Sequence, residues 1–382
     1  MTERLSTIIA GQRFENPVWL GSGTLGETMP RVRSLLSSDA GAIIPRTTRL
    51  HFAEGREKNP SPHLDIHTET HAIRNSEWTG ATIEYWRPYL RELRESGHIV
   101  MSVSGRDIPG CVAVCKELDS YQFPLLEINI SCPQSNDAYG FITRNSDHIQ
   151  QVVSEIKDAG VITPIAIKLG HSDYIVQLAQ VAEEAGADAI TAINSYGPVL
   201  DFDISDGKPE LTLGISGGKG GLSGRPIFLI ALTDVADLAR HIQIPIIACG
   251  GVEWAEDVIK MIMAGASAVQ VYTAAHLQGI HAPHYLSQLV ADVENWMQQH
   301  KYNAIQDIHG MVLPKLSGNH VMDKQIPSVK PNTCLGCKKC EPICLEQAIH
   351  IDEPNSPQID PTACIGCGAC VTICPTAALD YK

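Results

Sequence analysis

The stretch PIAIKLGHSDYIVQLAQVAEEAGADAITAIN, residues 164–194, contains one complete strand–helix–strand unit. Its two ends are apolar and rich in β-branched residues, which is typical of parallel strands that are covered on both faces. Between them, Ile175, Leu178, Ala182 and Ala185 share one face of a helix, and Gly186 provides a C-terminal stop. The pattern therefore predicts a strand, a crossover helix and a second parallel strand.

The same unit recurs on both sides of this stretch. Apolar segments alternate with helical patterns, and the predicted strands cover 18–22, 42–45, 98–104, 125–131, 164–170, 189–194, 245–251 and 268–274. Eight such units over roughly 300 residues predict an α/β fold of the (β/α)₈, or TIM-barrel, type. An open doubly wound sheet is the alternative, but it usually has an early glycine-rich turn, whereas the glycines here cluster late.

The end of the chain carries a cysteine repeat. CLGCKKCEPIC at residues 334–344 is echoed by CIGCGACVTIC at residues 364–374, and eight of the 12 cysteines lie there. C-x₂-C-x₂-C-x₃-C is the bacterial ferredoxin pattern, in which three cysteines hold one cluster and the fourth reaches the other. The pattern predicts two [4Fe–4S] clusters, the first on Cys334, Cys337, Cys340 and Cys374, and the second on Cys364, Cys367, Cys370 and Cys344. Structural zinc and disulfides are the alternatives.

Three regions follow from these patterns. Residues 1–304 are expected to form the catalytic barrel, and residues 331–382 a small α+β ferredoxin-like domain. Between them, periodicity fades, and Pro314, Gly318 and Pro327 interrupt a polar run. Residues 305–330 are therefore interpreted as a linker that packs on the barrel and forms no ordered element.

Composition excludes several classes of protein. The 382 residues carry 29 Lys and Arg against 43 Asp and Glu, a net charge of −14, which argues against a nucleic-acid partner. No apolar run approaches the roughly 18 residues of a membrane helix, and the first ten residues lack the core of a signal peptide. We therefore expect a cytoplasmic protein without a membrane partner.

The clusters imply a further cofactor in the barrel. A [4Fe–4S] cluster carries one electron, while most redox steps on carbon move two, so a converter is needed, and a flavin is the common one. Barrel sites lie at the C-terminal ends of the strands, with phosphate usually near the last two. The segments 217–224, 249–251 and 272–273 bring glycines or a threonine to those positions, where backbone N–H groups can approach a phosphate closely.

Several motifs, in the same order along the chain, resemble one family. EINISCP at 127–133, IKLG at 167–170, AINS at 192–195, GGLSG at 220–224 and CGGV…AGASAVQVYTA from 249 are similar to the flavin barrel of dihydroorotate and dihydropyrimidine dehydrogenases. The resemblance covers about residues 5–300. The tail resembles the C-terminal part of dihydropyrimidine dehydrogenase.

This resemblance implies FMN as the cofactor. Lys168 would lie beside the flavin, where a cation stabilises the reduced ring. Arg46 takes the place of a lysine that is usual after the second strand, and could instead bind a substrate carboxylate. The implied cofactor-binding residues are Ser22, Gly23, Arg46, Lys168, Gly221, Gly250, Gly251, Tyr272 and Thr273.

The resemblance also implies a substrate site with an acid–base group. Cys132 would exchange a proton on the face opposite the flavin, since hydride transfer to one carbon requires protonation of its neighbour. Cys132 and Lys168 are thus the catalytic candidates. The implied substrate-binding residues are Asn75, Glu77, Asn129, Ser131, Asn194 and Ser195.

The first interpretation is an oxidoreductase that interconverts uracil or thymine with its 5,6-dihydro form. Arg46, and a loop after Cys132 that lacks the expected Gly-Met-rich sequence, keep an alternative open: dihydroorotate or another conjugated cyclic carbonyl. A second alternative, from another class, is a non-catalytic electron-transfer subunit. No convincing GxGxxG follows an early strand, so we expect an NAD(P)/FAD flavoprotein subunit or a ferredoxin as electron partner, and a homodimer or heterotetramer.

Overall fold

The computed structural model describes residues 3–51, 62–76, 81–97, 99–133, 145–211, 217–316, 324–330, 332–352 and 356–381. The chain divides into two compact units, Met1–Leu316 and Ser317–Lys382. Each unit has its own apolar cluster, and each is described by itself below. Of the helices in the described part of the chain, none is both long and apolar enough to cross a membrane.

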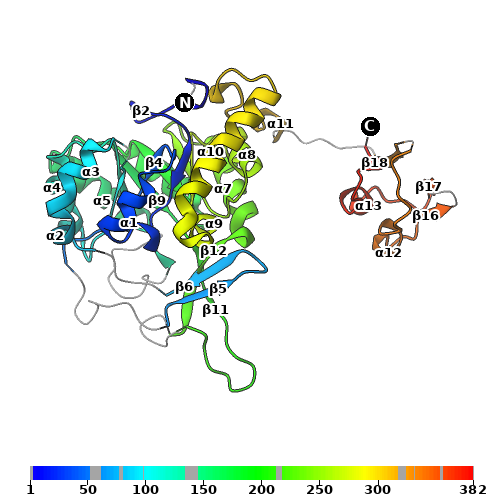
Figure 1. Cartoon of the computed structure of the whole chain (residues 1–382), viewed down its shortest axis with the longest axis horizontal. Helices are drawn as coiled ribbons and strands as arrows, with labels where there is room; N and C mark the ends of the chain where they lie inside the picture. The colour runs from blue at the N-terminus through cyan, green and yellow to red at the C-terminus, as the bar shows by residue number, and fades with distance from the viewer. Residues whose placement is uncertain are drawn as a thin grey trace. The chain divides into compact units, whose positions relative to one another are not determined.

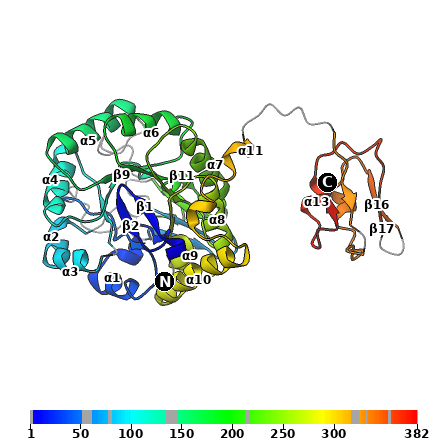
Figure 2. The same ribbon diagram turned by 90° about the horizontal axis from the view of Figure 1, so that it is seen from above.

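The first unit is a parallel barrel surrounded by helices (Figures 1 and 2). Its strands are β3 (Val18–Leu20), β4 (Ala42–Ile43), β7 (Met101–Val103), β8 (Leu126–Asn129), β9 (Ile165–Leu169), β10 (Ala189–Ala192), β13 (Ile246–Cys249) and β14 (Ala268–Val271). They pair in the order β4-β3-β14-β13-β10-β9-β8-β7. Parallel bridges from Ile43 to Ile99 and from Thr48 to Val103 join the two ends, so the sheet closes. The (β/α)₈ prediction is confirmed, and all eight predicted strands are present.

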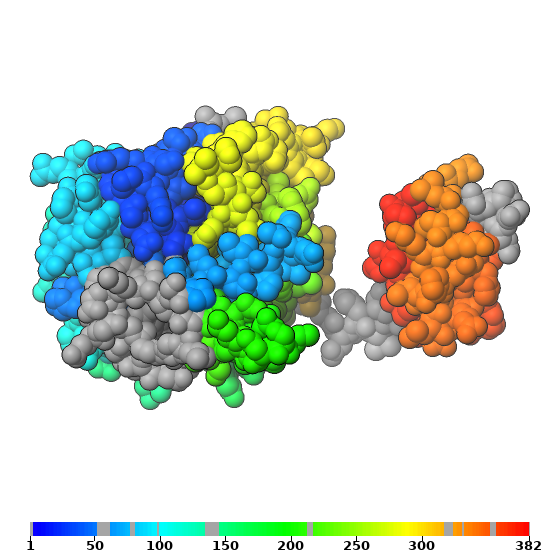
Figure 3. All heavy atoms as spheres, turned by 60° about the horizontal axis from the view of Figure 1, so that its bottom comes forward, coloured from blue at the N-terminus to red at the C-terminus, as the bar shows by residue number. Residues whose placement is uncertain are grey.

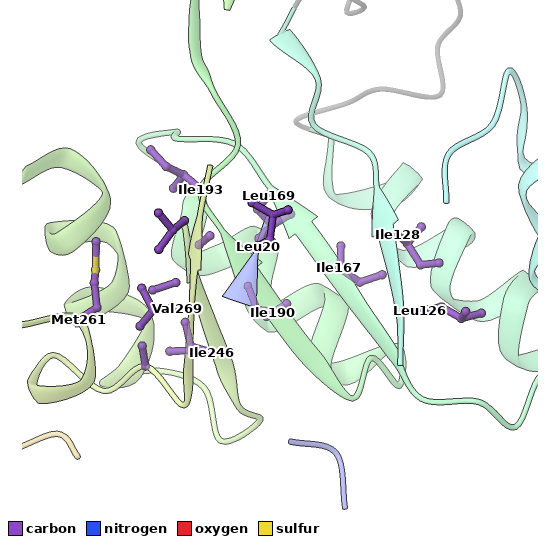
Figure 4. Packing of buried hydrophobic residues seen from close by; sticks show 14 of the residues in the cluster. Leu20, Leu126, Ile128, Ile167, Leu169, Ile190, Ile193, Ile246, Met261 and Val269 are labelled. Carbon is purple, nitrogen blue, oxygen red and sulfur yellow. The ribbon is translucent and has the colours of Figure 1, made fainter. Parts of the chain in front are cut away.

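The helices form the outer layer of the barrel. They are α1 (Met29–Leu35), α2 (Ile83–Trp86), α3 (Leu90–Glu95), α4 (Ile108–Asp119), α5 (Ser146–Asp158), α6 (Ile175–Glu184), α7 (Phe228–Ala239), α8 (Ala255–Met263), α9 (Thr273–Leu277), α10 (Ala282–Gln299) and α11 (Leu313–Leu316). Short 3₁₀ turns are η1 (Glu3–Leu5), η2 (Thr24–Gly26), η3 (Arg87–Tyr89), η5 (Arg225–Ile227), η6 (Gly279–His281) and η7 (Ile305–Asp307). Outward-facing strand residues such as Ile128, Ile167 and Val269 pack under these helices in one buried cluster (Figure 4).

A hairpin covers one end of the barrel. It consists of β1 (Thr7–Ile9) and β2 (Gln12–Phe14), and it lies over the centre of the ring of strands in Figure 2. Ile9 and Phe14 belong to the same buried cluster as the lower barrel interior, and the Phe14 ring lies 4.5 Å from that of Trp19. This end, where the strands begin, is therefore filled with apolar side chains.

A four-stranded antiparallel sheet lies beyond the opposite end of the barrel strands. Its strands are β5 (Leu64–His67), β6 (Ala72–Asn75), β11 (Tyr196–Leu200) and β12 (Lys219–Gly224), in the order β11-β12-β6-β5. In Figure 3 the light-blue β5–β6 segment and the green β11 segment lie side by side on one face of the molecule. The glycine-rich segment 217–224, expected to approach a phosphate, is mostly strand β12, because its backbone pairs with both β6 and β11.

The second unit is a small α+β domain. Its elements are β15 (Ser328–Val329), α12 (Cys340–Ile343), β16 (Ile349–Asp352), β17 (Ser356–Ile359), α13 (Ala369–Thr372) and β18 (Leu379–Asp380). Strand β15 pairs with β18, and β16 pairs with β17, both antiparallel.

The segment expected to be a linker, residues 305–330, is divided between the two units. Ile305 and Ile308 are buried in the barrel cluster, and α11 also belongs to the first unit. At the other end, β15 is part of the second unit through its pairing with β18. The elements η7 and α11 are too short to produce a helical pattern in the sequence, which is why this segment carries no periodic signal.

Candidate active site and cysteine clusters

The barrel interior changes from apolar to polar along the strands. The lower layer consists of residues that share one buried cluster, namely Trp19, Ala42, Val100, Leu125, Ala166, Ala189, Ile247 and Ala268. Two residues further along the same strands, the inner face carries Ser102, Glu127, Lys168, Thr191, Cys249 and Gln270. Because side chains alternate between the faces of a strand, these six point into the barrel as well. The chemistry is therefore concentrated towards the C-terminal ends of the strands, where barrel enzymes have their sites.

Lys168 is held in a buried triad with Glu127 and Gln270. The Lys168 ammonium donates to Glu127 Oε1 at 3.1 Å and to Gln270 Oε1 at 3.0 Å, and Gln270 Nε2 donates to Glu127 Oε2 at 2.6 Å. Burial lowers the pKa of Lys168, but the charge of Glu127, helped by Cys249, outweighs it, so the pKa is raised overall. Lys168 is therefore a fixed cation inside the barrel.

A chain of hydroxyl and amide groups connects the ends of the first four strands. The hydroxyl of Ser22 donates to Pro45 O at 3.0 Å and lies 3.2 Å from Thr47 Oγ1, which lies 2.9 Å from Ser102 Oγ. Asn129 Nδ2 donates to the same Thr47 oxygen at 3.2 Å. Ser22 and Asn129, predicted separately for cofactor and substrate, are thus linked through Thr47.

The same series of hydrogen-bonded groups continues to the fifth and sixth strands. Asn194 Nδ2 donates to Asn129 Oδ1 at 3.1 Å and to Ser131 Oγ at 3.2 Å, and Ser131 Oγ donates to Lys168 O at 2.6 Å. The backbone N–H of Ser195 donates to Asn194 Oδ1 at 2.8 Å. The structure therefore brings together four predicted substrate residues: Asn129, Ser131, Asn194 and Ser195.

Cys132 directly follows Ser131 and is partly exposed. It lies at the end of the strand-four motif, next to the amide and hydroxyl network. In contrast, Cys111 and Cys115 are fully buried in α4, and burial raises the pKa of the Cys249 thiol. Of the barrel cysteines, Cys132 is thus the one that adjoins the predicted substrate residues.

Asn75 belongs to the four-stranded sheet. It ends β6 and lies opposite Gly221 of β12. A side chain at the neighbouring Gly220 would meet the Asn75 carbonyl oxygen at 2.8 Å, so β6 and β12 approach closely here. Glu77, the other substrate residue predicted in this segment, lies outside the described residues.

The glycines at the last strands form a close-packed cradle. Gly250 and Gly251 end β13 with φ of 131° and 70°, and a Cβ at Gly251 would lie 2.6 Å from the Phe228 backbone. A Cβ at Gly224 would lie 2.8 Å from Thr273 Cγ2, and Thr273 Oγ1 donates to Ser223 Oγ at 2.8 Å. These segments lie near the start of α7 and α9, where backbone N–H groups and helix N-termini can favour a phosphate.

The first and last strands also meet at this rim. A Cβ at Gly23 would lie 2.1 Å from the Tyr272 ring, and Tyr272 Oη lies 2.7 Å from Thr24 Oγ1 and 3.1 Å from His276 Nδ1. Arg46, in contrast, is 7% exposed and donates to Glu27 Oε1 at 2.7 Å. An aromatic ring, a glycine cradle and a buried cation together fit a flavin mononucleotide.

In the second unit, cysteines of the two sequence runs lie near one another. One small cavity is lined by Cys334, Cys337, Cys340 and Cys374, so the first sequence run contributes three of its cysteines and the second run one. Burial raises the pKa of Cys370, and the charges of Cys364, Cys344 and Cys367 raise it further. The assignment of four cysteines to each cluster stays a prediction from the spacing.

Backbone N–H groups point at the cysteine sulfurs in both groups. Gly336 and Gly366 donate to Cys334 and Cys364 at 3.4 Å, and Ala348 and Ala378 donate to Cys344 and Cys374 at 3.3 and 3.2 Å. Such donors stabilise the negative charge of thiolates that ligate a cluster. The donor set, four sulfurs with backbone N–H support in each group, therefore fits [4Fe–4S] clusters.

Sequence reasoning missed Glu127, Gln270, Thr47 and Ser102. The signal for Glu127 was present, because an acidic residue stands at an inner position of an otherwise apolar strand. The partners Gln270 and Thr47 are distant in sequence from the residues they bind, so only the folded barrel reveals them.

A barrel with a glycine cradle at its rim, joined to two four-cysteine groups, defines a flavin- and iron–sulfur-dependent oxidoreductase. Residues 4–293 match the family described as dihydroorotate dehydrogenase, and residues 333–378 match the 4Fe-4S dicluster domain. The chain belongs to the dihydroorotate dehydrogenase family. Accordingly it acts on a CH–CH bond, with FMN and two [4Fe–4S] clusters as its cofactors.

Curated relatives cover most of the barrel. The catalytic subunit of dihydroorotate dehydrogenase B (NAD(+)) from Methanothermobacter thermautotrophicus is 30% identical over 309 residues, which is 80% of this chain and 98% of the relative. Dihydroorotate dehydrogenase A (fumarate) from Limosilactobacillus reuteri is 30% identical over 318 residues, 80% and 97% of the two chains. The solved structure of DHODH in complex with ferulenol from Eimeria tenella has a TM-score of 0.64 at 22% identity over 81% and 88%, and shares the fold.

The comparisons correct the expected substrate. They support a dihydroorotate dehydrogenase-like oxidoreductase, the alternative in the sequence analysis, better than the reduction of uracil or thymine. The dicluster match also favours iron–sulfur clusters over zinc.

Proposed function

We propose that this chain interconverts dihydroorotate and orotate and relays the electrons through its two clusters to a partner. The observation that carries the proposal is the network of Asn129, Ser131 and Asn194 beside Cys132 at the strand ends. Amide and hydroxyl groups can match the alternating N–H and C=O groups of a pyrimidine ring. The curated relatives are named dihydroorotate dehydrogenases, and their substrate is a pyrimidine ring that carries a carboxylate.

Asn129 and Asn194 are proposed to bind the substrate ring. Each amide is fixed by a partner: Asn194 Nδ2 donates to Asn129 Oδ1 and Ser131 Oγ, and Asn129 Nδ2 donates to Thr47 Oγ1. Side chains that are already oriented lose little entropy when the substrate binds. Asn75, Glu77 and Ser195 are proposed to complete the site.

Cys132 is proposed to move the proton. When dihydroorotate is oxidised, the Cys132 thiolate takes the proton from one ring carbon; in the reverse direction the thiol returns it. FMN, when bound, would supply the two-electron acceptor for the hydride of the neighbouring carbon, which leaves a C=C bond in the ring. The hydrogen bond from Ser131 to Lys168 O fixes the segment that carries Cys132.

The glycine cradle is proposed to hold the FMN phosphate. Gly221, Gly250, Gly251 and Thr273 would supply backbone N–H groups, and Lys168 would place its charge beside the ring. Ser22, Gly23, Arg46 and Tyr272 are proposed to line the remaining sides.

The cysteine groups are proposed to hold one cluster each. Cys334, Cys337, Cys340 and Cys374 would bind the first cluster, and Cys364, Cys367, Cys370 and Cys344 the second. As electron partner we propose an NAD(P)/FAD flavoprotein subunit or a ferredoxin, in a homodimer or heterotetramer. The M. thermautotrophicus and L. reuteri relatives name different acceptors, so the acceptor is left to experiment.

An anaerobic titration tests the substrate. The protein is purified without oxygen and fully reduced, and orotate, uracil or thymine is added separately while flavin and cluster absorbance is followed. Reoxidation by orotate alone supports the proposal. Reoxidation by uracil or thymine instead would restore the pyrimidine-base interpretation, and no response to any of the three would contradict both.

A Cys132→Ser variant tests the proton transfer. We expect turnover to fall about 10²–10⁴-fold because a serine hydroxyl is a far weaker acid and base at this position. Flavin content, iron content and reduction of the clusters by dithionite should not change. If neither protein turns over substrate and both transfer electrons equally, the chain is a non-catalytic electron-transfer subunit.

A further inference from the structure

The charge of Lys168 is balanced inside the barrel by one carboxylate. Lys168 and Glu127 have side chains that are 5% and 1% exposed, and their charged atoms lie 3.1 Å apart. Gln270 is 1% exposed and bridges them, accepting from the ammonium and donating to the other carboxylate oxygen. All three stand in the polar layer directly below the strand ends.

The surroundings of the triad contain little other charge. Glu127 and Cys249 are the titratable side chains whose charge acts on Lys168 among the residues that the structure describes. Burial raises the pKa of Cys249, so its thiol is neutral near pH 7. Thr191, fully buried in the same layer, has a hydroxyl with no hydrogen-bond partner among the described residues. The net charge of this layer therefore depends on Lys168 and Glu127.

We propose that Glu127 is a positioning residue that sets the net charge facing the FMN, and that it keeps the reduction potential of the FMN lower than an unpaired Lys168 would. This inference rests on the proposed function, in which Lys168 lies beside the bound cofactor. Reduction adds negative charge to a flavin, and a nearby cation stabilises it. An ion pair presents a dipole in place of a full positive charge, and charges interact strongly in a buried, low-dielectric site.

Gln270 has a separate part in this arrangement. Its amide fills the gap between the ammonium and the second carboxylate oxygen, so the triad has a fixed donor–acceptor order. It holds both side chains in place but adds no charge. Removing Gln270 should therefore loosen the triad without changing the charge that faces the cofactor.

Three variants separate charge from hydrogen bonding. E127Q removes the negative charge; Q270M breaks the same network and keeps the charge; the double variant E127Q/Q270E moves the charge to the neighbouring residue. In the double variant each donor still meets an acceptor, because the new amide at position 127 can donate to the new carboxylate at position 270 while Lys168 donates to both. Flavin midpoint potentials are measured in the full chain by anaerobic redox titration at pH 6, where Lys168 is most readily protonated.

We expect E127Q to raise the ratio of reduced to oxidised FMN at least tenfold at a fixed potential, about 30 mV for a two-electron couple. Q270M should change it less than threefold, and the double variant should return close to wild type. The E127Q shift should shrink at pH 9, because Lys168 has lost the carboxylate that offsets its burial and releases its proton. A hydrogen bond lost for structural reasons alone would not produce this pH dependence.

Two results would overturn the inference. One is an unchanged potential in E127Q; the other is a shift in Q270M as large as that in E127Q. If E127Q fails to retain FMN, the double variant E127Q/Q270E decides between the explanations. A flavin content and a midpoint potential near those of wild type would support the role of the charge. A double variant that also fails to retain FMN would contradict it. Potentials that do not move while wild-type turnover of dihydroorotate persists would remove this inference alone, whereas a wild-type chain without flavin would remove the proposed function as well.

Discussion

At the scale of single residues, Gly251 carries a constraint that can be measured. Its φ of 70° is in the left-handed region, and an added Cβ would lie 2.6 Å from the Phe228 backbone. A left-handed backbone costs an alanine roughly 1–2 kcal/mol. Gly251→Ala should therefore lower the free energy of unfolding by this amount plus the cost of the clash with Phe228. The variant should also retain less FMN. Urea unfolding and flavin absorbance check both.

Gly160→Ala is the matched control. Gly160 has a φ of 80°, at the end of α5, but a Cβ there meets nothing within 4 Å. The Gly160→Ala variant should lose only the free energy that the left-handed backbone costs an alanine, and it should keep its FMN. Equal losses in the two variants would show that the cradle is not tightly packed.

His276 predicts part of the acid sensitivity of the barrel. Burial lowers the pKa of His276, and Arg31 lowers it further, so the folded chain binds this proton later than the unfolded chain does. Below the unfolded value of about 6.5 the unfolded state is therefore favoured as the pH falls. Between pH 7 and 5.5, wild type should lose more thermal stability than His276→Gln does. An identical loss in both proteins would assign the effect to other groups.

At the scale of elements, cysteine variants can test which residues bind each iron–sulfur cluster. In the proposed assignment, Cys374→Ser and Cys344→Ser each remove one ligand from the cluster whose other three ligands belong to the other run. Each variant should lose about half of its iron or more, and low-temperature EPR of the reduced protein should show that the remaining signal differs between the two. Cys111→Ser, far from both groups in sequence and buried in α4, should keep its iron. Full iron content in Cys374→Ser would contradict the crossed arrangement.

The barrel strands could be predicted from the sequence, and the four-stranded sheet could not. Strands such as β9 and β10 are buried at every position, so their apolar runs are continuous. Strand β12 consists of KGGLSG, and β11 alternates between exposed and partly buried residues. Glycines and exposed positions give no apolar pattern, so only pairing in the folded chain identifies these segments as strands.

The residues of the candidate site could also be predicted only in part. Asn129, Ser131, Lys168 and Asn194 stand inside motifs at strand ends, where chemistry is expected. Glu127 and Gln270 lie one layer deeper, and their importance comes from contacts across 143 and 102 positions of the chain. No local pattern contains such contacts.

At the scale of the whole molecule, the two units should be separable. The 309 aligned residues make up 98% of the M. thermautotrophicus relative, so that protein has no counterpart of the second unit. A chain that ends at Leu316 should therefore fold, bind FMN and be reduced by dihydroorotate, but contain no iron and fail to reduce the electron partner. Flavin and iron analysis with an artificial dye as acceptor checks this. A truncated chain without flavin would show that the barrel depends on the tail.

The interlaced cysteines have a consequence for the life of the protein in the cell. Among the described residues of the second unit, the apolar cluster contains four buried ones, Cys340, Ile349, Ile351 and Leu379, far fewer than a domain needs to fold without a metal. If each cluster takes cysteines from both halves of the repeat, as proposed, iron binding would hold the two halves of the second unit together. When iron is scarce, we expect newly made chains to have a folded barrel and an unfolded second unit that proteases can cleave. The amount of active enzyme would then depend on the supply of iron rather than on the rate of protein synthesis.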